Sequence, residues 1–464
     1  MKHWTRLIAL VMAGLLTAAC AGCSGGDKPG ESKQGETGYE GKPEQKYLDA
    51  GKEIPYKDLN LEGREITIAA WWDPKPADKG SSTAAELGWE RIEYLEGKYN
   101  CKFVFLPMVQ AEMIARIQTS VEAGDPVFDV GYVAASTVPM LANKEYLQDL
   151  KGVECFDLSA DKWAKFPQTV GVFGDKVYTF EMGSVFYPRQ VMLWNKTMFE
   201  KNNWPNLYEL VEKKEWTFEK MLEIAQLATD EASGRAGIVG YADLLQNQII
   251  LSNDAELISF DDNGVPHFAA DSPNALESIQ FLLDLDRKYK VMGEPEAPTW
   301  DYYTQAFKDG KVAMAFTELY MVGDIKDMKD NYGIVPPPMG PKATTYSSRV
   351  GDAPIQVMLA NNPKLQEVGF ILDLYSEPFP GEENNWRTGY EAFLRDDDSV
   401  NLVKKISDEY AQFDNAFFFP GARNLINTAI NDVWYGEKTP AEAIGEIKTQ
   451  AEKSIQDTYA GWTK

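Results

Sequence analysis

Short apolar runs alternate with helical patterns over the first part of the chain. Residues 65–70, 103–106 and 128–133 are short runs rich in apolar side chains, and each run predicts a strand. Between them, residues 81–100 and 113–121 repeat apolar side chains at the spacing of one helix face. Strand, helix, strand, helix, strand is the order of a parallel sheet covered by helices, so we expect an α/β fold.

Candidate binding residues come directly after two of these strands. In a parallel α/β sheet, ligands bind beyond the carboxyl ends of the strands. Trp71, Trp72 and Asp73 follow the first predicted strand, and Ser136 follows the third. Side chains alternate along a strand, so we expect Trp71 and Trp72 to point to opposite sides and at most one to face a ligand.

The rest of the chain continues as a mixture of strands and helices. Residues 176–180, 191–194 and 312–316 predict further strands, whereas helical patterns dominate up to about residue 290 and again from residue 384. Residues 261–264 (DDNG) lie between two apolar runs and predict a hairpin turn. A calcium loop is the alternative, but the ligand spacing does not fit. His267 is then a strand or turn residue without a catalytic role.

The N-terminus has the pattern of an export signal. Lys2 and Arg6 precede an apolar run over residues 7–19, which predicts a signal peptide over residues 1–19. The run is too short to span a bilayer, which takes roughly 20 apolar residues. Ordinary cleavage with a free N-terminus is the alternative, but it leaves two cysteines beside the cleavage site unexplained.

Those two cysteines predict a lipid anchor. Residues 16–20 (LTAAC) resemble the bacterial lipobox, which makes Cys20 the expected lipid acceptor and Cys23 the alternative. Residues 20–58 are rich in Gly, Lys, Glu, Ser and Pro, so we expect them to form a flexible tether. The predicted product is a protein held at the membrane by its N-terminal lipid alone.

Composition narrows the possible functions. The 464 residues are 44% hydrophobic and 25% charged, as in globular proteins of two or three domains. A net charge of -25 argues against nucleic acid and anionic lipid surfaces as partners. The chain has two histidines, and His3 lies in the predicted signal peptide, so cleavage would leave His267 alone and exclude a multi-histidine metal site; we expect no cofactor. Cys101 and Cys155 are open to two interpretations, one disulfide or two buried thiols.

A family resemblance rests on six segments taken in order. They are residues 58–64 (DLNLEGR), 119–130 (TSVEAGDPVFDV), 193–200 (LWNKTMFE), 215–222 (EWTFEKML), 307–314 (FKDGKVAM) and 436–443 (GEKTPAEA). Together they resemble motifs of bacterial extracellular solute-binding protein family 1, the sugar-binding proteins of ABC importers. The matches span about residues 59 to 459, which is nearly the whole chain after the predicted tether.

This resemblance implies a periplasmic-binding-protein-like fold of the class II type. Its two lobes would each be a mostly parallel sheet flanked by helices, joined by a hinge that closes on ligand. By analogy, residues 59–170 with 312–355 form the first lobe, and residues 171–311 with 356–464 form the second. The implied partners are a carbohydrate and the permease subunits of an importer. The implied protein is a monomer on the outer face of a Gram-positive cell membrane.

Sugar chemistry and the resemblance select the remaining candidate residues. Aromatic rings cover the C–H faces of sugars, whereas carboxylates, amides and guanidinium groups bond the hydroxyls. The additional candidates are therefore Glu181, Phe186, Tyr187, Arg189, Tyr241, Glu318, Tyr320, Asp352 and Trp386. Two other functions are considered. A secreted glycosidase would use paired carboxylates, but no motif singles out two of them. A sugar sensor would share the fold without the transport role.

Overall fold

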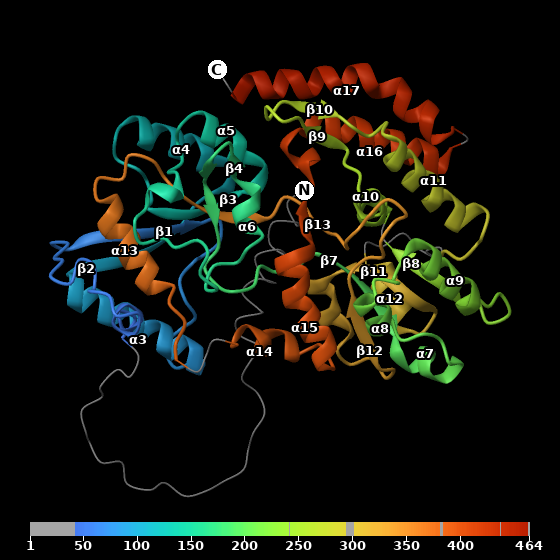
Figure 1. Ribbon diagram of the computed structural model, residues 1–464, viewed down its shortest axis with the longest axis horizontal. Helices are drawn as coiled ribbons and strands as arrows, with labels where there is room; N and C mark the ends of the chain where they lie inside the picture. The colour runs from blue at the N-terminus through green and yellow to red at the C-terminus, as the bar shows by residue number, and fades with distance from the viewer. Residues whose placement is uncertain (1–41, 241, 294–300, 381–383, 437, 463–464) are drawn as a thin grey trace, which may run out of the picture.

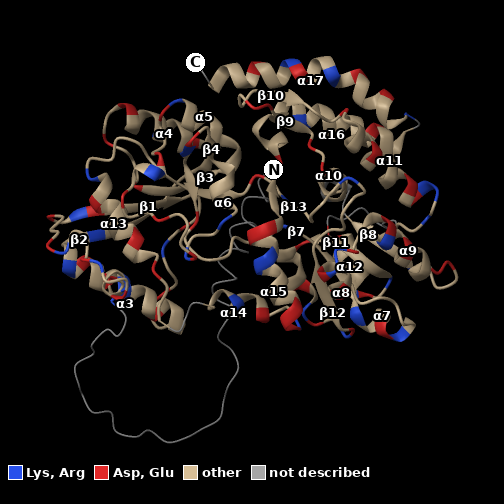
Figure 2. Ribbon diagram, viewed as in Figure 1, with Lys and Arg blue, Asp and Glu red and all other residues tan. Residues whose placement is uncertain are grey.

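Figure 1 shows a computed structural model with two α/β lobes lying side by side. The structure describes residues 42–240, 242–293, 301–380, 384–436 and 438–462. The predicted signal peptide, both candidate lipid-acceptor cysteines and the first part of the predicted tether lie outside these residues. Charged residues lie mainly on the helices and connecting segments of both lobes, as Figure 2 shows.

The first lobe is built on a five-stranded sheet in the order β2-β1-β3-β14-β6. Its strands are β1 (Arg64–Ala70), β2 (Cys101–Pro107), β3 (Val130–Ala134), β6 (Thr179–Phe180) and β14 (Pro354–Met358). β1 pairs in parallel with β2 and β3, whereas β14 is antiparallel to both β3 and β6. Four strands therefore share one direction and β14 alone is reversed.

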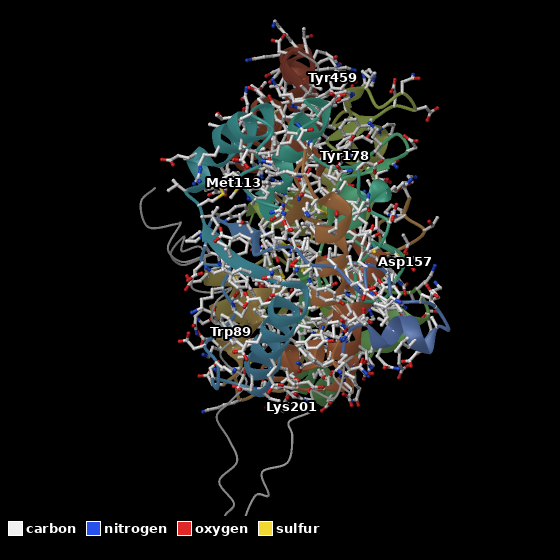
Figure 3. The ribbon with its side chains drawn as sticks, turned by 90° about the vertical axis from the view of Figure 1, so that its left-hand side faces the viewer. Trp89, Met113, Asp157, Tyr178, Lys201 and Tyr459 are labelled. Atoms are coloured by element: carbon white, nitrogen blue, oxygen red, sulfur yellow. The ribbon has the colours of Figure 1, made fainter. Side chains whose placement is uncertain are left out.

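Helices cover this first sheet as the apolar spacing predicts. α3 (Thr83–Tyr99) begins where the Ser82 side chain accepts the amide hydrogen of Ala85, and ends at Asn100 in the left-handed conformation. α4 (Gln110–Glu122) buries Met113, Ile117 and Val121 along one face. In Figure 3, which looks onto the first lobe, Trp89 of α3 lies below Met113 of α4. The lobe also contains α5 (Val138–Asn143), α6 (Pro167–Val170), α13 (Leu365–Tyr375) and the hairpin of β4 (Val172–Phe173) and β5 (Lys176–Val177).

The second lobe is built on a four-stranded sheet in the order β12-β7-β11-β8. Its strands are β7 (Gln190–Asn195), β8 (Ala236–Gly240), β11 (Val312–Glu318) and β12 (Tyr332–Val335). β7 is antiparallel to β11 and β12, and β8 is parallel to β11, so β7 alone is reversed. The flanking helices are α7 (Lys196–Asn202), α8 (Leu207–Glu212), α9 (Phe218–Ala228), α12 (Tyr302–Lys308), α14 (Trp386–Glu391) and α15 (Asp397–Lys405).

Both sheets are thus mostly parallel, as expected, but the expected lobe boundaries are wrong in two places. Strand β11 was assigned to the first lobe, yet it pairs with β7 and β8 in the second. Residues 356–375 were assigned to the second lobe, yet β14 pairs with β3, and α13 packs in the core of the first lobe. The chain returns to the first lobe only after β12, through residues 336–353. The two reversed strands are β7 and β14. In each case the strand is the first that the chain forms in that sheet after crossing from the other lobe.

A third group of elements packs above the second lobe and reaches the first (Figure 1). It comprises α10 (Ala242–Ser252), α11 (Pro273–Arg287), α16 (Pro420–Tyr435), α17 (Pro440–Trp462), and the β9 (Ile258–Phe260) and β10 (Pro266–Phe268) hairpin. Leu141 of α5, Ile426 of α16 and Ile444 of α17 share one apolar core. β13 (Ser348–Val350) and β15 (Ala411–Phe413) form a further parallel pair.

The hairpin turn at residues 261–264 is confirmed. The Asp261 side chain accepts the amide hydrogens of Asn263 and Val265, at 2.9 and 2.8 Å, and Gly264 has a φ of 74°. His267 lies in β10, within 4 Å of the carboxylates of Asp261 and Glu452. It is an exposed residue of a strand, one of the two positions predicted for it.

The expected tether ends earlier than residue 58. Residues 42–58 pack against the first lobe and include α2 (Gln45–Asp49). Glu44 is 2% exposed and accepts hydrogen bonds from Lys98 and Tyr99, both at 2.6 Å. Lys46 and Tyr47 both bond the buried carboxylate of Asp373 on α13. We call residues 42–58 the strap, because ionic contacts fix them to α3 and α13.

The two remaining cysteines are free thiols, Cys101 buried and Cys155 partly exposed, so no disulfide joins them. Burial raises the pKa of the Cys101 thiol to about 11. Within the described ranges, no helix has the length and apolar character needed to cross a membrane.

Candidate ligand-binding site

Four segments that carry predicted residues meet at one edge of the first sheet, which we call the first-lobe edge. β1, β3 and β6 end there, and the reversed strand β14 begins there. Pro354 pairs with Ala134, and Gln356 pairs with Phe180. The edge therefore carries Trp71 and Trp72 after β1, Ser136 after β3, Glu181 after β6, and Asp352 before β14.

Aromatic rings form a cluster at the first-lobe edge. The rings of Trp71 and Trp72 meet edge to face at 5.3 Å between centroids, and Trp72 lies 4.8 Å from Tyr132. The expectation that the two tryptophans point to opposite sides is wrong, because strand geometry ends at Ala70 and the chain bends there. Tyr132 was missed, although it lies two residues before the end of β3 and so shares a face with Ala134.

A hydrogen-bonded pair holds the centre of this edge. The backbone amide and the hydroxyl of Ser136 each donate to the Asp352 carboxylate at 2.9 Å. Partial removal of the Asp352 carboxylate from water raises its pKa. The Ser136 hydrogen bonds and the charges of Arg423 and Arg189 oppose this shift. Solvent still reaches the Asp352 side chain. Arg423, on α16, gave no signal in the sequence.

Glu181 is the first residue after β6. Its Oε1 accepts a hydrogen bond from the Tyr132 hydroxyl at 2.9 Å, whereas its Oε2 is shielded from solvent and has no partner among the described residues. Burial raises the pKa of Glu181 to about 8, and the Tyr132 hydrogen bond only partly opposes that shift. The neutral carboxylic acid therefore predominates at pH 7.

The second-lobe edge is the corresponding edge of the second sheet. β11 ends and β7 begins there, because Glu318 pairs with Gln190. Arg189 precedes β7, and its carbonyl accepts the amide hydrogen of Leu319 at 2.8 Å. Tyr320 follows, and burial together with the Glu318 carboxylate raises its pKa well above the usual value. The predicted residues Arg189, Glu318 and Tyr320 are therefore neighbours.

A second aromatic cluster lies at this edge. Tyr187 stacks on Tyr390 of α14 at 5.9 Å, with the ring planes 26° apart, and Trp386 lies 6.1 Å from Tyr390. Burial raises the pKa of Tyr187, and the nearby Tyr390 phenol adds to the shift. The Tyr187 hydroxyl is buried and has no hydrogen-bond partner in the described part of the chain. Tyr390 was missed, although it lies four residues after Trp386 on one helix face.

Three predicted residues do not join these clusters. Phe186 is only 7% exposed and packs on Phe166 at 5.0 Å, so it is a core residue and its assignment to the site is wrong. Asp73 is exposed, and its carboxylate accepts the amide hydrogen of Lys75 in a turn. Tyr241 lies outside the described residues.

Residues 181–189 join the two edges directly, because they lead from the end of β6 to the start of β7. The charge of Arg189 reaches Asp352 on the other lobe strongly enough to affect the pKa of that carboxyl. Together the edges offer aromatic faces, carboxyl groups and a guanidinium group. These groups suit an uncharged ligand with apolar faces and many hydroxyls.

Two hollows lie away from both edges. One, of about 390 Å³, lies between α16 and α17 and is lined by Leu425, Thr428 and Ile447 among others. The other, of about 640 Å³, is lined by Leu158, Gln168 and neighbouring residues of the first lobe. Neither contains a residue of the two aromatic clusters. No group of three or more metal-binding side chains occurs in the described ranges.

The topology and the two edges define a two-lobed α/β binding protein of the periplasmic-binding-protein type, class II. The chain belongs to the family of bacterial extracellular solute-binding proteins, whose profile matches residues 90–369. The expected family and fold class are thereby confirmed. No curated protein sequence matches the chain.

Solved structures of other proteins share this fold. An ABC substrate-binding protein from Listeria monocytogenes in complex with cycloalternan is 17% identical, with a TM-score of 0.54, and the match covers 86% of this chain and 99% of that one. The cyclic alpha-maltosyl-1,6-maltose binding protein from Arthrobacter globiformis is 16% identical (TM-score 0.58; 86% and 99% covered). A maltose/maltodextrin-binding domain from Bdellovibrio bacteriovorus bound to maltotriose is 16% identical (TM-score 0.54; 85% and 100% covered). At these identities the likeness establishes the fold alone.

Proposed function

We propose that the protein is a lipid-anchored, extracellular substrate-binding protein of an ABC importer. It binds an oligosaccharide between its two lobes, which close on the sugar, and delivers it to a membrane permease. The observation that carries this proposal is the presence of an aromatic cluster at each sheet edge, Trp71–Trp72–Tyr132 on one lobe and Tyr187–Tyr390–Trp386 on the other.

The chemistry of sugars fits such a pair of clusters. A sugar ring has C–H-rich faces, which stack on aromatic rings, and a rim of hydroxyls, which bond carboxyl and guanidinium groups. Asp352 and Glu181 supply carboxyl groups at the first-lobe edge, and Arg189 supplies a guanidinium at the second. A ligand that contacts both edges favours the closed arrangement of the lobes by its extra contacts there.

The structural neighbours favour an oligosaccharide over a single sugar. Cycloalternan, maltotriose and cyclic alpha-maltosyl-1,6-maltose, named for those proteins, are each built of several sugar units. Those proteins and the matched family are binding proteins, which favours binding without catalysis here. A sugar recovered intact after incubation supports binding, whereas hydrolysis products would indicate a glycosidase.

A thermal-shift screen over mono- and oligosaccharides, followed by calorimetry, tests this function. We expect an oligosaccharide to raise the melting temperature, and Trp72→Ala to weaken its binding. Trp204→Ala is the matched control, because Trp204 is also half-buried but packs on Phe199 in the second-lobe core. Equal affinity in wild type and in both the Trp71→Ala and Trp72→Ala variants would remove the tryptophans from the site.

The anchor has its own test. The full-length chain with Cys20 and Cys23 both changed to Ser should appear in the culture medium. The two single variants then show which cysteine carries the lipid, and we expect Cys20→Ser alone to release the protein. A double variant that stays with the membrane fraction would contradict the lipid anchor without affecting the binding proposal.

A further inference from the structure

Three side chains link the segment between the lobes to the aromatic surface of the first-lobe edge. Glu181 begins the crossing segment, its carboxyl group accepts the Tyr132 hydroxyl at 2.9 Å, and the Tyr132 ring contacts Trp72 at 4.8 Å. We call these three residues the proton array. Trp72 also contacts Trp71, so two residues of the array, Tyr132 and Trp72, belong to the aromatic cluster that we propose binds the ligand.

The carboxyl group of Glu181 has few hydrogen-bond partners. Tyr132 of β3 is its one hydrogen-bond partner in the described ranges, and Oε2 has none. On β14, Gln356 is engaged by the amide of Met182 at 2.8 Å. Tyr375, at the end of α13, helps to raise the pKa of Tyr132, but it does not contribute to the pKa shift of Glu181.

No positive charge in the described ranges compensates Glu181. Lys162 lies on the segment next to residues 181–183, but its ammonium group bonds the carboxylates of Asp373 and Glu377 at 2.6 and 3.0 Å. At the second-lobe edge, Arg189 and Glu318 do not contribute to the pKa shift of Glu181. A carboxylate at this position would therefore be buried with one hydroxyl as its only donor, which is costly.

We propose that the proton array makes ligand binding proton-dependent: the neutral Glu181 stays buried beside Tyr132 and Trp72, and its ionisation draws the carboxylate toward water and displaces these two side chains. The proposal rests on the proposed function only for the ligand, since the array itself can be observed without one. An ionised Glu181 favours conformations in which the carboxylate reaches water. Because Glu181 begins the crossing segment, such a movement disturbs both Tyr132 and the path between the lobes.

The direction of the pH effect follows from the raised pKa. The folded protein holds a proton on Glu181 up to about pH 8, whereas an unfolded chain releases it near 4.5. The stability that comes from this protonation is complete below about pH 4.5 and is lost as the pH rises through about 8. A neutral ligand that covers the array adds desolvation, so its affinity should fall above pH 8, by up to about tenfold per pH unit.

Tryptophan fluorescence of the ligand-free, full chain between pH 6 and 10 tests the array itself. We expect wild type to show a transition with its midpoint near pH 8, and Glu181→Gln, which stays neutral, to lack it. Trp72→Phe should reduce the amplitude. Tyr132→Phe removes a hydrogen bond that lowers the pKa of Glu181, so the midpoint should move upward. A transition that persists in Glu181→Gln, or none in wild type, overturns the proposal.

Calorimetry with a sugar from the screened panel measures how ligand affinity depends on pH. Affinity should fall above pH 8 in wild type and stay level in Glu181→Gln. Glu256→Gln is the matched control, because burial also raises the pKa of Glu256, which bonds Asn415 away from the array, and it should keep the wild-type profile. If no sugar binds at any pH, the proposed function fails and the fluorescence titration still decides the array. Equal pH profiles in wild type and Glu181→Gln overturn the array and leave the function standing.

Discussion

The two sheet edges differ in how many of their polar groups are already bonded. At the first-lobe edge, Ser136 holds Asp352 through two hydrogen bonds, and Tyr132 holds Glu181 through one. At the second-lobe edge, the Tyr187 hydroxyl is buried without a partner, and the Arg189 guanidinium makes no hydrogen bond or ion pair with another described residue. Apart from Glu181 Oε2, these polar groups of the first edge are bonded to one another, whereas the second edge retains donors that are not in use.

This difference suggests separate roles for the lobes under the proposed function. Groups that are held in place lose little conformational entropy when a ligand arrives, so a pre-bonded surface is suited to first contact. Donors without partners gain most from a ligand, so their bonds favour closure after that contact. We therefore expect changes at the first-lobe edge to cost both stability and affinity, and changes at the second-lobe edge to cost affinity alone.

The strap gives the largest expected effect. A chain that begins at Leu59 lacks Glu44 and Lys46, so Asp373 loses a cation in a buried network and Tyr99 loses its acceptor. We expect it to be less stable than a chain that begins at Lys42 by about 3–5 kcal/mol, the cost of breaking a buried ion pair. Urea unfolding of the two truncated proteins measures the difference. Equal unfolding midpoints would show that the strap does not stabilise the first lobe.

Trp72→Ala should have the next largest effect. It removes a ring that contacts both Trp71 and Tyr132, so we expect sugar affinity to fall by about 2–3 kcal/mol, or roughly 30- to 150-fold. The melting temperature should fall as well, because Tyr132 loses its packing partner. Calorimetry and thermal unfolding measure the two effects. A loss of affinity without any loss of stability would contradict the view that this edge is pre-bonded.

Arg189→Gln tests the second-lobe edge, where we expect a loss of affinity without a loss of stability. A charged hydrogen bond to ligand contributes about 1.5 kcal/mol, so affinity should fall roughly tenfold. The ligand-free melting temperature should stay within a degree or so of wild type, because the guanidinium has no hydrogen bond or ion pair with a described residue to lose. A clear drop in stability would show that Arg189 is already engaged in the free protein, and the contrast between the edges would disappear.

Much of the fold follows from local patterns. The runs that became β1, β2 and β3 and the helical spacing of α3 and α4 were predicted from the sequence and are confirmed. Strand ends then pointed to Trp72 and Ser136, because the rule that ligands bind beyond strand ends needs only the strand order. Asp352 was selected from the family resemblance instead. Local periodicity suffices where one element buries one face.

Long-range pairing and irregular segments could not be predicted in this way. The partner of β11 is decided by packing between segments far apart in the chain, so local patterns could not assign its lobe, and the family analogy assigned it to the wrong one. Phe186 and Tyr187 are adjacent aromatics in a segment without regular geometry, and no periodicity tells which one enters the core. Tyr132 and Tyr390 belong to the site because their rings contact Trp72 and Tyr187, which are far from them in the sequence.

Tyr187→Phe gives the smallest effect and the most direct comparison of the two edges. It removes only the hydroxyl, whose burial without a partner is unfavourable, so the ligand-free protein should gain up to about 1 kcal/mol of stability. Affinity should fall severalfold if the hydroxyl bonds a sugar. Tyr132→Phe is the matched control at the first-lobe edge, where the hydroxyl is bonded, and it should lose stability at pH 7. Opposite signs for these two Tyr→Phe changes in urea unfolding support the contrast, and equal signs contradict it. Because both variants keep their aromatic rings, the result reports on the hydroxyls alone.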